Sequence, residues 1–478
     1  MHNIFLIFQH EWQQKKRSGL FKLLFIAMQI LLIVTLFTGW SQYKNTQDQQ
    51  LSAQEIVMQQ WLTQPDRHPH RVAHFGHFTF RPPSALSFFD NGVNHFVGNS
   101  IYIEAHKQNS AMFSNSQQSD VLLRFSDLSV ATILLICWPL MLIALGFNSI
   151  NIEYNAGTMR QLFSINVSIP VLITGKILAY LLISLLFIIP IFITCFGLIA
   201  WSDSVITLDI VLRITGLFVL YLIYCLIWIS IILLVSSCVC YGPHALTLLI
   251  AIWFMLTIIS PRILADIAAE TYPQPSRNEF NFLIKKEISQ VGDSHNPDDP
   301  HFNEFKKQLL NKYRVNDVSE LPVNYRALVI QEGERISSEI YMRQYQSIMV
   351  QQQKQQNFIS YWYWVNPYLL VRDLSMALSA TDIWHFYDYE NQTEAHRYAR
   401  ITQINQIHAE FIDAEHDRES KAEADHWLEF EDFNYQQPTL TQSIAPIKWR
   451  GFILFILIGL FAVFFSLPQL SRRLHELA

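Results

Sequence analysis

The chain has 478 residues, of which 51% are hydrophobic, 14% are aromatic and only 15% are charged. This balance is too apolar for an ordinary soluble protein and indicates a membrane protein. The formal net charge is −6, which argues against a chain that binds the phosphates of nucleic acid.

The charge is divided unevenly along the sequence. From Pro261 to Ile447 there are 28 acidic and 17 basic side chains, a net charge of −11, whereas the remainder has a net charge of +5. Such a division predicts a membrane core joined to a large acidic aqueous domain. All five cysteines lie in or beside apolar segments, so the sequence offers no disulfide framework for the aqueous parts.

Residues 1–19 are predicted to form an amphipathic elbow helix that lies in the membrane interface. Four large apolar side chains share one helical face there: Ile4, Phe5, Phe8 and Trp12. An irregular basic tail is the alternative. Residues 20–40 form the first predicted transmembrane helix, at about the length that crosses the hydrocarbon layer. No small-residue cleavage site follows this run, so we expect no cleavable signal peptide.

Residues 41–127 form the first predicted extracytoplasmic domain. It begins with a helical stretch around residues 50–62 and contains a strand-like stretch in which Ile101, Ile103 and Ala105 alternate with polar residues. Paired prolines and an Asn-Gly dipeptide between these two stretches mark loop and turn.

Histidines are concentrated in this domain, at His68, His70, His74 and His77. Imidazole suits a borderline metal such as zinc or copper, so these four are candidate ligands. A solvated loop is the alternative that we favour. His74 and His77 share a face only in a helix, and Gly76 argues against a helix there.

Residues 128–264 contain four further apolar runs, each long enough to cross a membrane. They cover approximately Leu128–Ile150, Val171–Trp201, Ile210–Ser236 and Ala245–Leu264. A sixth run, Gly451–Pro468, lies within residues 448–478, which end in a short tail with Arg472 and Arg473. The predicted fold class is mainly α: a polytopic membrane protein with six transmembrane helices, an N-terminal interfacial helix and two extracytoplasmic insertions.

Basic residues beside the apolar runs suggest the orientation. With both termini in the cytoplasm, the inner segments hold Lys15, Lys16, Arg17, Lys22, Arg160, Lys176, Arg472 and Arg473. Arg124, Arg262, Lys448 and Arg450 then lie at outer ends, which weakens this argument without reversing it. Residues 41–127 and 265–447 are therefore expected to face the periplasm, or the outside of a cell with one membrane.

The second insertion, residues 265–447, is predicted to be a helical domain. Residues from Tyr325 to about Phe358 have apolar side chains at helical intervals and predict one long helix. Asn366-Pro367 interrupts it, and Ser379 or Thr381 is expected to cap a further helix that runs through Ile407. Two such helices, folded back on each other, would project roughly tens of ångströms from the bilayer.

A short polar island separates the second and third apolar runs. Between Asp127 and Asp203 the only charged residues are Glu153, Arg160 and Lys176. A charge in hydrocarbon costs at least a few kcal/mol, so a segment that carries three of them belongs at a membrane surface.

The island resembles a loop of a known family of transporters. It carries the order Glu-x-x-x-Gly-Thr-x-Arg-x-Leu-x-Ser within residues 151–168, followed by Pro170 and Gly175-Lys176. This order is similar to the cytoplasmic loop of type-2 ABC permeases, the export-type subunits, in which a short coupling helix docks onto a separate ATPase. The resemblance implies that the contact residues are Glu153, Gly157, Thr158 and Arg160. An ordinary basic cytoplasmic loop is the alternative.

The resemblance covers the membrane core, a little over half of the chain, and most members have smaller outer loops. Further pieces resemble a bacterial subgroup related to the permeases of copper-enzyme maturation clusters: Arg81-Pro-Pro-Ser-Ala-Leu-Ser, Ala105-His-Lys-Gln-Asn109, Asn366-Pro-Tyr-Leu-Leu and Ala380-Thr-Asp382. The implied partners are ABC ATPase subunits that bind ATP and Mg, membrane lipid, and a second permease subunit, identical or related. The implied location is the bacterial cytoplasmic (inner) membrane.

The sequence offers no catalytic motif. It lacks a Gly-x-x-x-x-Gly-Lys-Ser/Thr phosphate loop, a zinc-protease histidine pair and a Gly-x-Ser-x-Gly turn. We therefore expect a non-catalytic subunit that binds no cofactor, with ATP hydrolysis in a partner chain.

An aromatic cluster in the second insertion has two interpretations. Tyr361, Trp362, Tyr363 and Trp364 are a candidate stacking platform for an aromatic or glycan ligand. Such a cluster is also typical of a core, or of a belt of rings at the level of the lipid headgroups.

Two functions remain open from the sequence. In the first, the chain couples ATP hydrolysis to the export or extraction of an unidentified substrate. In the second, it is a mechanical or scaffold subunit whose outer helices act on a periplasmic partner and transport nothing.

Overall fold

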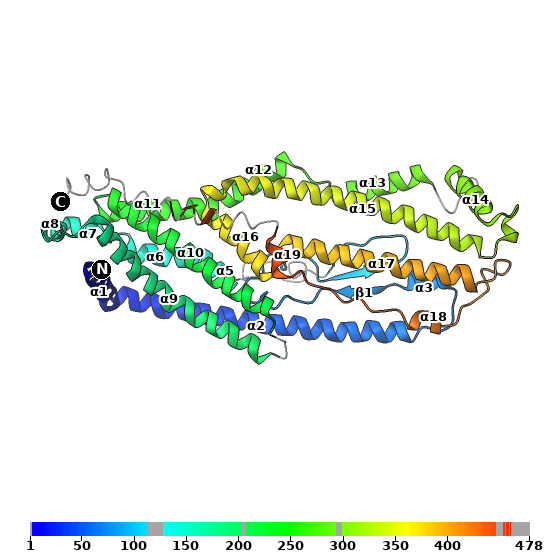
Figure 1. Ribbon diagram of the computed structural model, residues 1–478, viewed down its shortest axis with the longest axis horizontal. Coiled ribbons are helices and arrows are strands. Elements are labelled where there is room, and N and C mark those ends of the chain that lie inside the picture. The colour runs from blue at the N-terminus through cyan, green and yellow to red at the C-terminus, as the bar shows by residue number, and fades with distance from the viewer. Residues whose placement is uncertain are drawn as a thin grey trace.

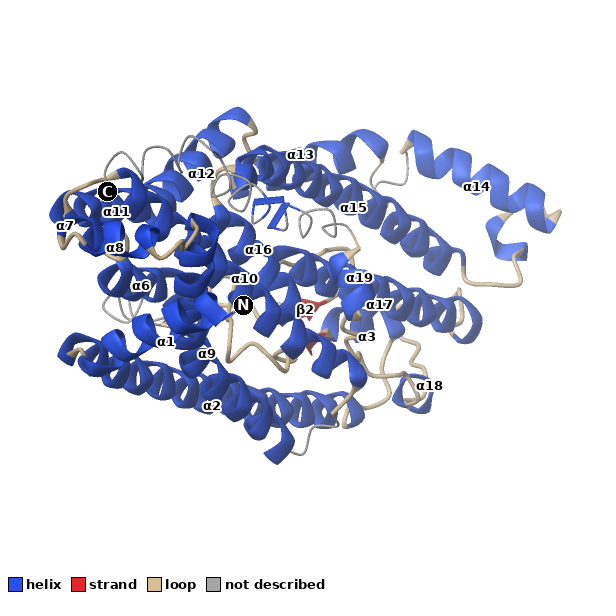
Figure 2. Cartoon of the chain, turned by 60° about the vertical axis from the view of Figure 1, so that its left-hand side comes forward, coloured by secondary structure: helices blue, strands red, loops and turns tan. Residues whose placement is uncertain are grey.

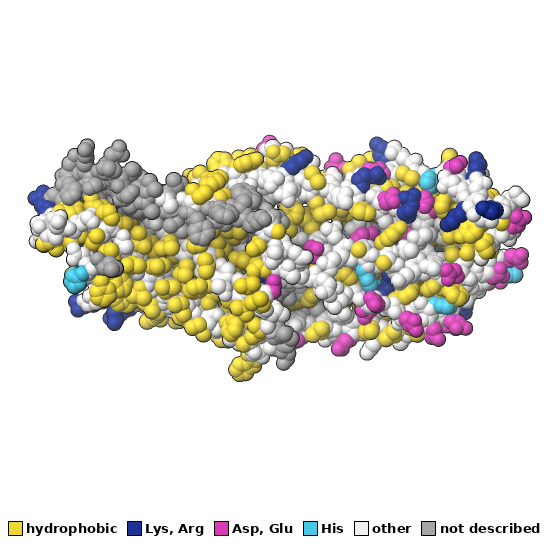
Figure 3. All heavy atoms as spheres, in the orientation of Figure 1, with side chains coloured by type: hydrophobic (Ala, Val, Ile, Leu, Met, Phe, Trp, Pro, Cys, Tyr) yellow, Lys and Arg dark blue, Asp and Glu magenta, His cyan; other side chains and the backbone are white. Residues whose placement is uncertain are grey.

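Long helices that run along one axis give the molecule an elongated shape (Figure 1). The computed structural model describes residues 2–112, 128–202, 206–292 and 299–445, together with positions 453, 454, 456, 457 and 459. Hydrophobic side chains cover the half that contains α6, α9, α10 and α11, whereas acidic and basic side chains gather over the other half (Figure 3). The molecule therefore has an apolar half and an aqueous half.

The chain begins with two helices, α1 (His2–Arg17) and α2 (Gly19–Leu62). The helix expected over residues 1–19 forms. We predicted that the first transmembrane helix ends near residue 40. It instead continues beyond that residue as one helix of 44 residues. Its length is about 66 Å, more than twice the hydrocarbon thickness. Residues 41–62 contain neither proline nor glycine, so nothing in them breaks the helix. Figure 1 shows α2 running from the apolar half far into the aqueous half.

Among the described residues, five helical segments are long and apolar enough to cross a membrane. They are Gly19–Leu62, Val130–Asn155, Ile169–Trp201, Leu208–Cys238 and Gly242–Thr271. The sixth predicted span, Gly451–Pro468, falls almost entirely outside the described residues, as do Arg472 and Arg473. The chain is thus mainly helical, with the character of a multi-pass membrane protein.

Several of these segments are composite. Val130–Asn155 consists of α5 (Val130–Thr132), the π-helical η2 (Ile133–Cys137), α6 (Trp138–Gly146) and α7 (Asn151–Asn155). Gly242–Thr271 consists of α11 (Gly242–Phe254), the π-helical η3 (Met255–Ile259) and α12 (Ser260–Thr271). The other two are the continuous helices α9 (Ile169–Trp201) and α10 (Leu208–Cys238).

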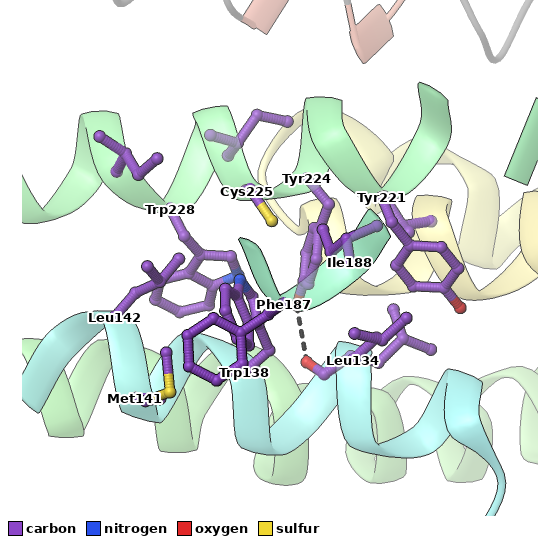
Figure 4. Close-up of a cluster of buried hydrophobic side chains, with 14 of the residues drawn as sticks. Leu134, Trp138, Met141, Leu142, Phe187, Ile188, Tyr221, Tyr224, Cys225 and Trp228 are labelled. Carbon is purple, nitrogen blue, oxygen red and sulfur yellow. Dashed lines mark hydrogen bonds between the residues drawn. The ribbon is translucent and has the colours of Figure 1, made fainter. Parts of the chain in front are cut away.

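Aromatic side chains interlock α6, α9 and α10 at the centre of the apolar half (Figure 4). The rings of Trp138 and Phe187 lie 4.5 Å apart in an edge-on arrangement, and both side chains are fully buried. Tyr224 is equally buried, and its hydroxyl donates a hydrogen bond of 2.9 Å to the carbonyl of Leu135. Such edge-on ring pairs add about 0.5–1.5 kcal/mol to the burial itself.

The aqueous half combines a small sheet with long helices. Strands β1 (His77–Phe80) and β2 (Ser100–Ile103) pair antiparallel, with His77 opposite Ile103. The strand expected around Ile101 and Ile103 therefore forms. Figure 2 shows the two strands enclosed by helices. The helices of this half are α3 (Pro69–Phe75), α13 (Arg277–Val291), α14 (Pro300–Tyr313), α15 (Tyr325–Ser360) and α17 (Ile383–Phe411), with the shorter η4 (Val318–Glu320), α18 (Asp425–Leu428) and α19 (Leu440–Ile444).

The two long helices predicted in the second insertion are α15 and α17, and they pack against each other. The cap of α17 differs from our prediction, which named Ser379 or Thr381. Asp382 caps it by accepting a 3.0 Å hydrogen bond from the backbone N–H of His385. The preceding helix ends at Ser379, and Ala380 after it has a left-handed φ of 56°, so the next helix begins only after this turn.

Helix α16 (Pro367–Ser379) returns from the aqueous half to the apolar half, which the sequence did not predict. Leu370 and Val371 are fully buried in the same hydrophobic cluster as the membrane helices. The side chain of Asn366 fixes the turn before α16 by donating to the carbonyl of Leu256 at 2.8 Å and to the hydroxyl of Ser260 at 2.6 Å. The segment 265–447 is therefore not confined to the aqueous half.

Candidate functional site

The polar island folds into two short helices joined by a tight turn. Helix α7 ends at Asn155, Gly157 adopts a left-handed φ of 73°, and α8 (Thr158–Ser164) begins at once. The hydroxyl of Thr158 donates to the backbone carbonyl of Glu153 at 3.1 Å and also bonds its carboxylate. Met159 is buried beneath α8. The turn thus holds three of the four predicted contact residues, Glu153, Gly157 and Thr158, in one local structure.

A buried ionic network attaches this turn to α1 and α9. The ammonium of Lys176 lies 2.6 Å from a carboxylate oxygen of Glu11 and 3.5 Å from one of Glu153. The hydroxyl of Tyr180 donates to Glu11 at 3.1 Å. Burial alone would raise the pKa of Glu11, but Lys176 and Lys15 outweigh it and hold the pKa below its ordinary value.

Arg160, the fourth predicted contact residue, lies outside the bonded turn. Its side chain is exposed on α8, and the described part of the chain gives it no hydrogen bond or ion pair. Helix α8 forms one end of the molecule, on the same side as the N-terminus (Figure 1). The guanidinium is therefore available to a carboxylate on another protein, which it can bind with two parallel hydrogen bonds.

A cavity of about 530 Å³ lies between α1, α8 and α9. Its lining includes the charged Glu11, Glu153 and Lys176 beside apolar side chains such as Leu6 and Leu162. The ionic network thus borders open space on one side, which leaves α8 less tightly packed than the helices of the core.

The aromatic cluster of η5 (Tyr361–Trp364) does not form one platform. Tyr363 is fully buried, and its hydroxyl bonds the carboxylate of Asp373. Tyr361, Trp362 and Trp364 are exposed, at 76%, 44% and 46% of their surfaces. The buried ring belongs to the core, whereas the three exposed rings remain candidates for contact with lipid or a ligand.

The four predicted histidines are divided between separate environments. His68 caps α3 by accepting a 3.1 Å hydrogen bond from the backbone N–H of His70, so the expected loop is a short helix. His70 and His74 lie on one face of α3. His77 lies in β1, after Gly76 has ended the helix with a φ of 58°, and its ring contacts the guanidinium of Arg400.

The structure instead brings His70 and His74 to His106, a residue that the sequence analysis did not assign to a site. A second group consists of His68, His408 and Asp417. Burial, followed by the charges of His74 and His106, lowers the pKa of His70 to about 3. The missed members come from segments far apart in the sequence, so spacing along the chain contained no signal for them.

One further arginine was missed. Arg213, on the outer part of α10, is 2% exposed and pairs with Asp209 at 2.6 Å. Its guanidinium also donates to the carbonyls of Ala377 at 3.3 Å, Leu378 at 3.1 Å and Pro438 at 2.8 Å. This side chain joins α10 directly to α16, in the middle of the second insertion, and to Pro438 near the end of that insertion.

Comparison with known proteins gives one match. Residues 282–436 match a family described as Domain of unknown function (DUF3526). The match covers less than half of the chain and lies in the second insertion, outside the α7–α8 turn. No curated protein matches the chain. The second insertion is thus similar to a recurrent domain whose function is unassigned.

Proposed function

We propose that this chain is the membrane-spanning permease subunit of an ATP-binding cassette transporter of type 2, and that a separate ATPase binds at α8. The observation that carries this proposal is that one side of α8 is bound to the rest of the chain while the other side is exposed. Its inner side is fixed by Met159 and by the bonds between Thr158 and Glu153, whereas Arg160 faces outward without a partner among the described residues. A surface helix built in this way suits a docking contact.

The ion pairs of Lys176 provide a route by which movement of α8 reaches the membrane helices. Glu153 leads into the α7–α8 turn, and Lys176 links it to Glu11 and to α9. A displacement of the turn therefore moves α1 and α9 together, because breaking a buried ion pair costs several kcal/mol. ATP binding in the partner supplies the displacement, and the substrate is exported or extracted through the rearranged helices.

A second permease subunit would supply a second docking site. The segment Gly242–Thr271 exposes apolar side chains along much of its length, including Ile250, Phe254, Met255 and Ile263. In a bilayer this face contacts lipid or another subunit. The location that follows is the bacterial inner membrane, with α1 and α8 on the cytoplasmic side.

The experiment that tests this proposal is co-purification of the ATPase from native membranes with tagged Arg160→Glu. We expect the ATPase to be lost while the thermal unfolding temperature of the chain stays unchanged, since Arg160 has no hydrogen bond or ion pair with any described residue. Lys307→Glu is the matched control, because Lys307 is 73% exposed on α14 in the aqueous half. Stoichiometric retention of the ATPase by Arg160→Glu would contradict the docking assignment.

A mechanical function is the second candidate, and the contacts of Arg213 favour it. They tie α10 to α16 and to the segment that precedes α19, so movement of the membrane helices reaches the outer helices without a flexible linker. In this case the outer helices act on a periplasmic partner and no substrate crosses the membrane. Reconstituted vesicles distinguish the two functions, because only the first predicts ATP-dependent movement of a solute or lipid.

A further inference from the structure

Three histidines converge in the aqueous half, far from α8. His70 and His74 lie one turn apart on α3, and their rings are 4.6 Å apart. The ring of His106 lies 5.8 Å from that of His70 and 5.3 Å from that of His74. One nitrogen of each ring lies within 4.8 Å of the others. A metal ion with bonds of about 2.0–2.1 Å draws such nitrogens to roughly 3.4 Å from one another, which requires only small side-chain rotations.

The backbone holds His106 against α3. The N–H of Ala105 donates a 3.2 Å hydrogen bond to the carbonyl of Ala73, so the loop is fixed to the end of the helix that carries the other two histidines. His106 itself adopts a left-handed φ of 64°. Such a conformation is uncommon for a residue other than glycine, and it persists because the surrounding contacts determine it.

A buried carboxylate orients the ring of His106. Its Nδ1 lies 3.0 Å from an oxygen of Glu334, which is fully buried and pairs with Arg397 at 2.6 Å. A carboxylate paired with an arginine only accepts hydrogen bonds, so Nδ1 carries the proton and Nε2 has a free lone pair. A carboxylate that fixes a histidine in this way is the usual outer partner of a metal ligand.

His70 supplies a second indication. Its Nδ1 is buried and has no hydrogen-bond partner within the described ranges. Buried polar atoms are normally paired, so an orphaned imidazole nitrogen beside two other imidazoles calls for a ligand. His74 is exposed, so the group opens to solvent and leaves room for a fourth ligand.

The neighbouring group of His68, His408 and Asp417 also has buried imidazole nitrogens without a hydrogen-bond partner among the described residues, Nε2 of His68 and Nδ1 of His408, but its other polar atoms are largely engaged. The Nδ1 of His68 already accepts the hydrogen bond that caps α3. Asp417 is satisfied by His408 at 2.7 Å, by Asn324 at 2.9 Å and by Arg326 at 3.1 Å. The carboxylate and one nitrogen of each histidine are thus already engaged in this second group, whereas the three-histidine group opens to solvent at His74.

We propose that His70, His74 and His106 form a binding site for a borderline divalent transition metal such as Zn²⁺, with Glu334 as the outer partner that orients His106. Three imidazoles suit such an ion better than calcium or magnesium, which prefer oxygen ligands. Three protein ligands leave one position for water or an exchangeable ligand. The site is independent of the proposed ATPase contact, and the failure of either assignment leaves the other intact.

The test is titration of Zn²⁺ into the full-length chain, purified in detergent and stripped with a chelator, by calorimetry. The wild-type chain should bind one ion at this site, and Co²⁺ in its place should give the intense visible absorption of a four-coordinate ion. His74→Ala is the first variant because the side chain is exposed and its loss should not disturb folding. It should lower the affinity by at least 100-fold, and His106→Ala should do the same.

His416→Ala is the matched control, since His416 is an exposed histidine in the same half and pairs only with Asp413 within the described structure. It should bind Zn²⁺ as the wild type does. Binding that is unchanged in both His74→Ala and His106→Ala would overturn the proposal. So would an equal loss in His416→Ala, because that result would show adventitious binding to surface histidines. Thermal unfolding of each apo variant separates lost binding from lost structure, and only variants that melt with the wild type are compared.

Discussion

Lys176 lies 2.6 Å from Glu11, and each side chain is only 2% exposed. The two residues come from α9 and α1, which are separated in sequence by two predicted membrane spans. Two opposite charges have thus been removed from water together at the end of the molecule where α8 lies. Their attraction compensates for the loss of hydration only while both partners are present.

We predict that Lys176→Met destabilises the chain strongly, by about 3–5 kcal/mol, because it leaves Glu11 charged and buried. The double variant Lys176→Met, Glu11→Gln should recover most of that loss, since neither charge then remains. Thermal unfolding in detergent measures both effects. Lys307→Met is the control for the loss of an exposed lysine and should melt with the wild type. If the loss of stability in the double variant equals the sum of the losses in the two single variants, the two charges do not interact.

The turn between α7 and α8 gives a second prediction. Gly157 has a φ of 73°, and among the described residues, apart from its two chain neighbours, no atom lies within 4 Å of the position that a Cβ would occupy. The methyl group of Gly157→Ala therefore meets no steric obstacle. The left-handed backbone of the alanine should nevertheless destabilise the turn by about 1–2 kcal/mol. We expect faster amide hydrogen exchange across α8 and weaker retention of the ATPase.

Gly157→Asn is the matched comparison, because asparagine tolerates the left-handed region. It should retain more of the ATPase than Gly157→Ala does. If the alanine and asparagine variants behave alike, the backbone conformation of the turn is not what the contact requires.

The sequence predicted those parts of the structure that depend on local patterns. Five of the six apolar runs, the helix of residues 1–19 and the long helix that begins at Tyr325 are set by composition and by helical periodicity, and the described residues contain helices at these places. The extension of α2 to Leu62 was missed because we took the end of the apolar run as the end of the helix. A helix that leaves the membrane continues until a residue breaks it.

The contacts that join distant segments could not be read from spacing. Helix α16 is apolar on one face, and nothing local shows whether that face meets the membrane helices or the outer ones. The same holds for His106, which is placed beside α3 by the backbone bond between Ala105 and Ala73 and by its contacts with Glu334. Of the predicted histidines, His77 is excluded from the group because Gly76 ends the helix before it.

A partly buried carboxyl group in α17, that of Glu390, predicts how stability changes with pH. Burial raises the pKa of Glu390 to about 7, although the charge of Arg81 acts in the opposite direction. Tyr345 of α15 lies near Glu390, whose charge contributes to raising the pKa of the tyrosine. The folded state therefore holds the proton more tightly than the unfolded state, whose pKa is near 4.5.

Stability should fall as the pH rises from about 4.5 through 7, because the folded protein must then bury a charge. Glu390→Gln removes this penalty, so it should stabilise the chain at pH 8, by about 1–3 kcal/mol, and have little effect at pH 4. Thermal unfolding at the two pH values checks the sign. A destabilised variant at pH 8 would show that the charge of Glu390 has a favourable partner.

The orientation of the chain can be tested at two exposed positions. In a background that lacks the five native cysteines, Lys307→Cys should react with an impermeant maleimide in cells whose outer membrane, if present, is permeabilised. Arg160→Cys should react only after the inner membrane is lysed. Both side chains are exposed, so access and not burial decides the labelling. The reverse pattern would invert the proposed topology.

The last prediction concerns Arg213, which joins α10 to α16 and to the carbonyl of Pro438. The fifth and sixth predicted spans connect directly to the second insertion, which offers one route by which movement reaches the outer helices. The buried guanidinium provides a more direct route, because its hydrogen bonds fix α16 and the segment before α19 to a membrane helix. Arg213→Met keeps most of the apolar bulk and removes every donor.

In the complex with the proposed ATPase, we expect Arg213→Met to retain ATP turnover and to lose the effect of bound nucleotide on the outer helices. The measurement is amide hydrogen exchange in α15 and α17, with and without a non-hydrolysable ATP analogue. Thr215→Val is the control, since Thr215 lies exposed on the same helix and bonds only the carbonyl of Val211 among the described residues. It should respond to nucleotide as the wild type does. If Arg213→Met also responds in full, the movement travels along α2 or α12 instead, because these helices too extend from the apolar half towards the aqueous half.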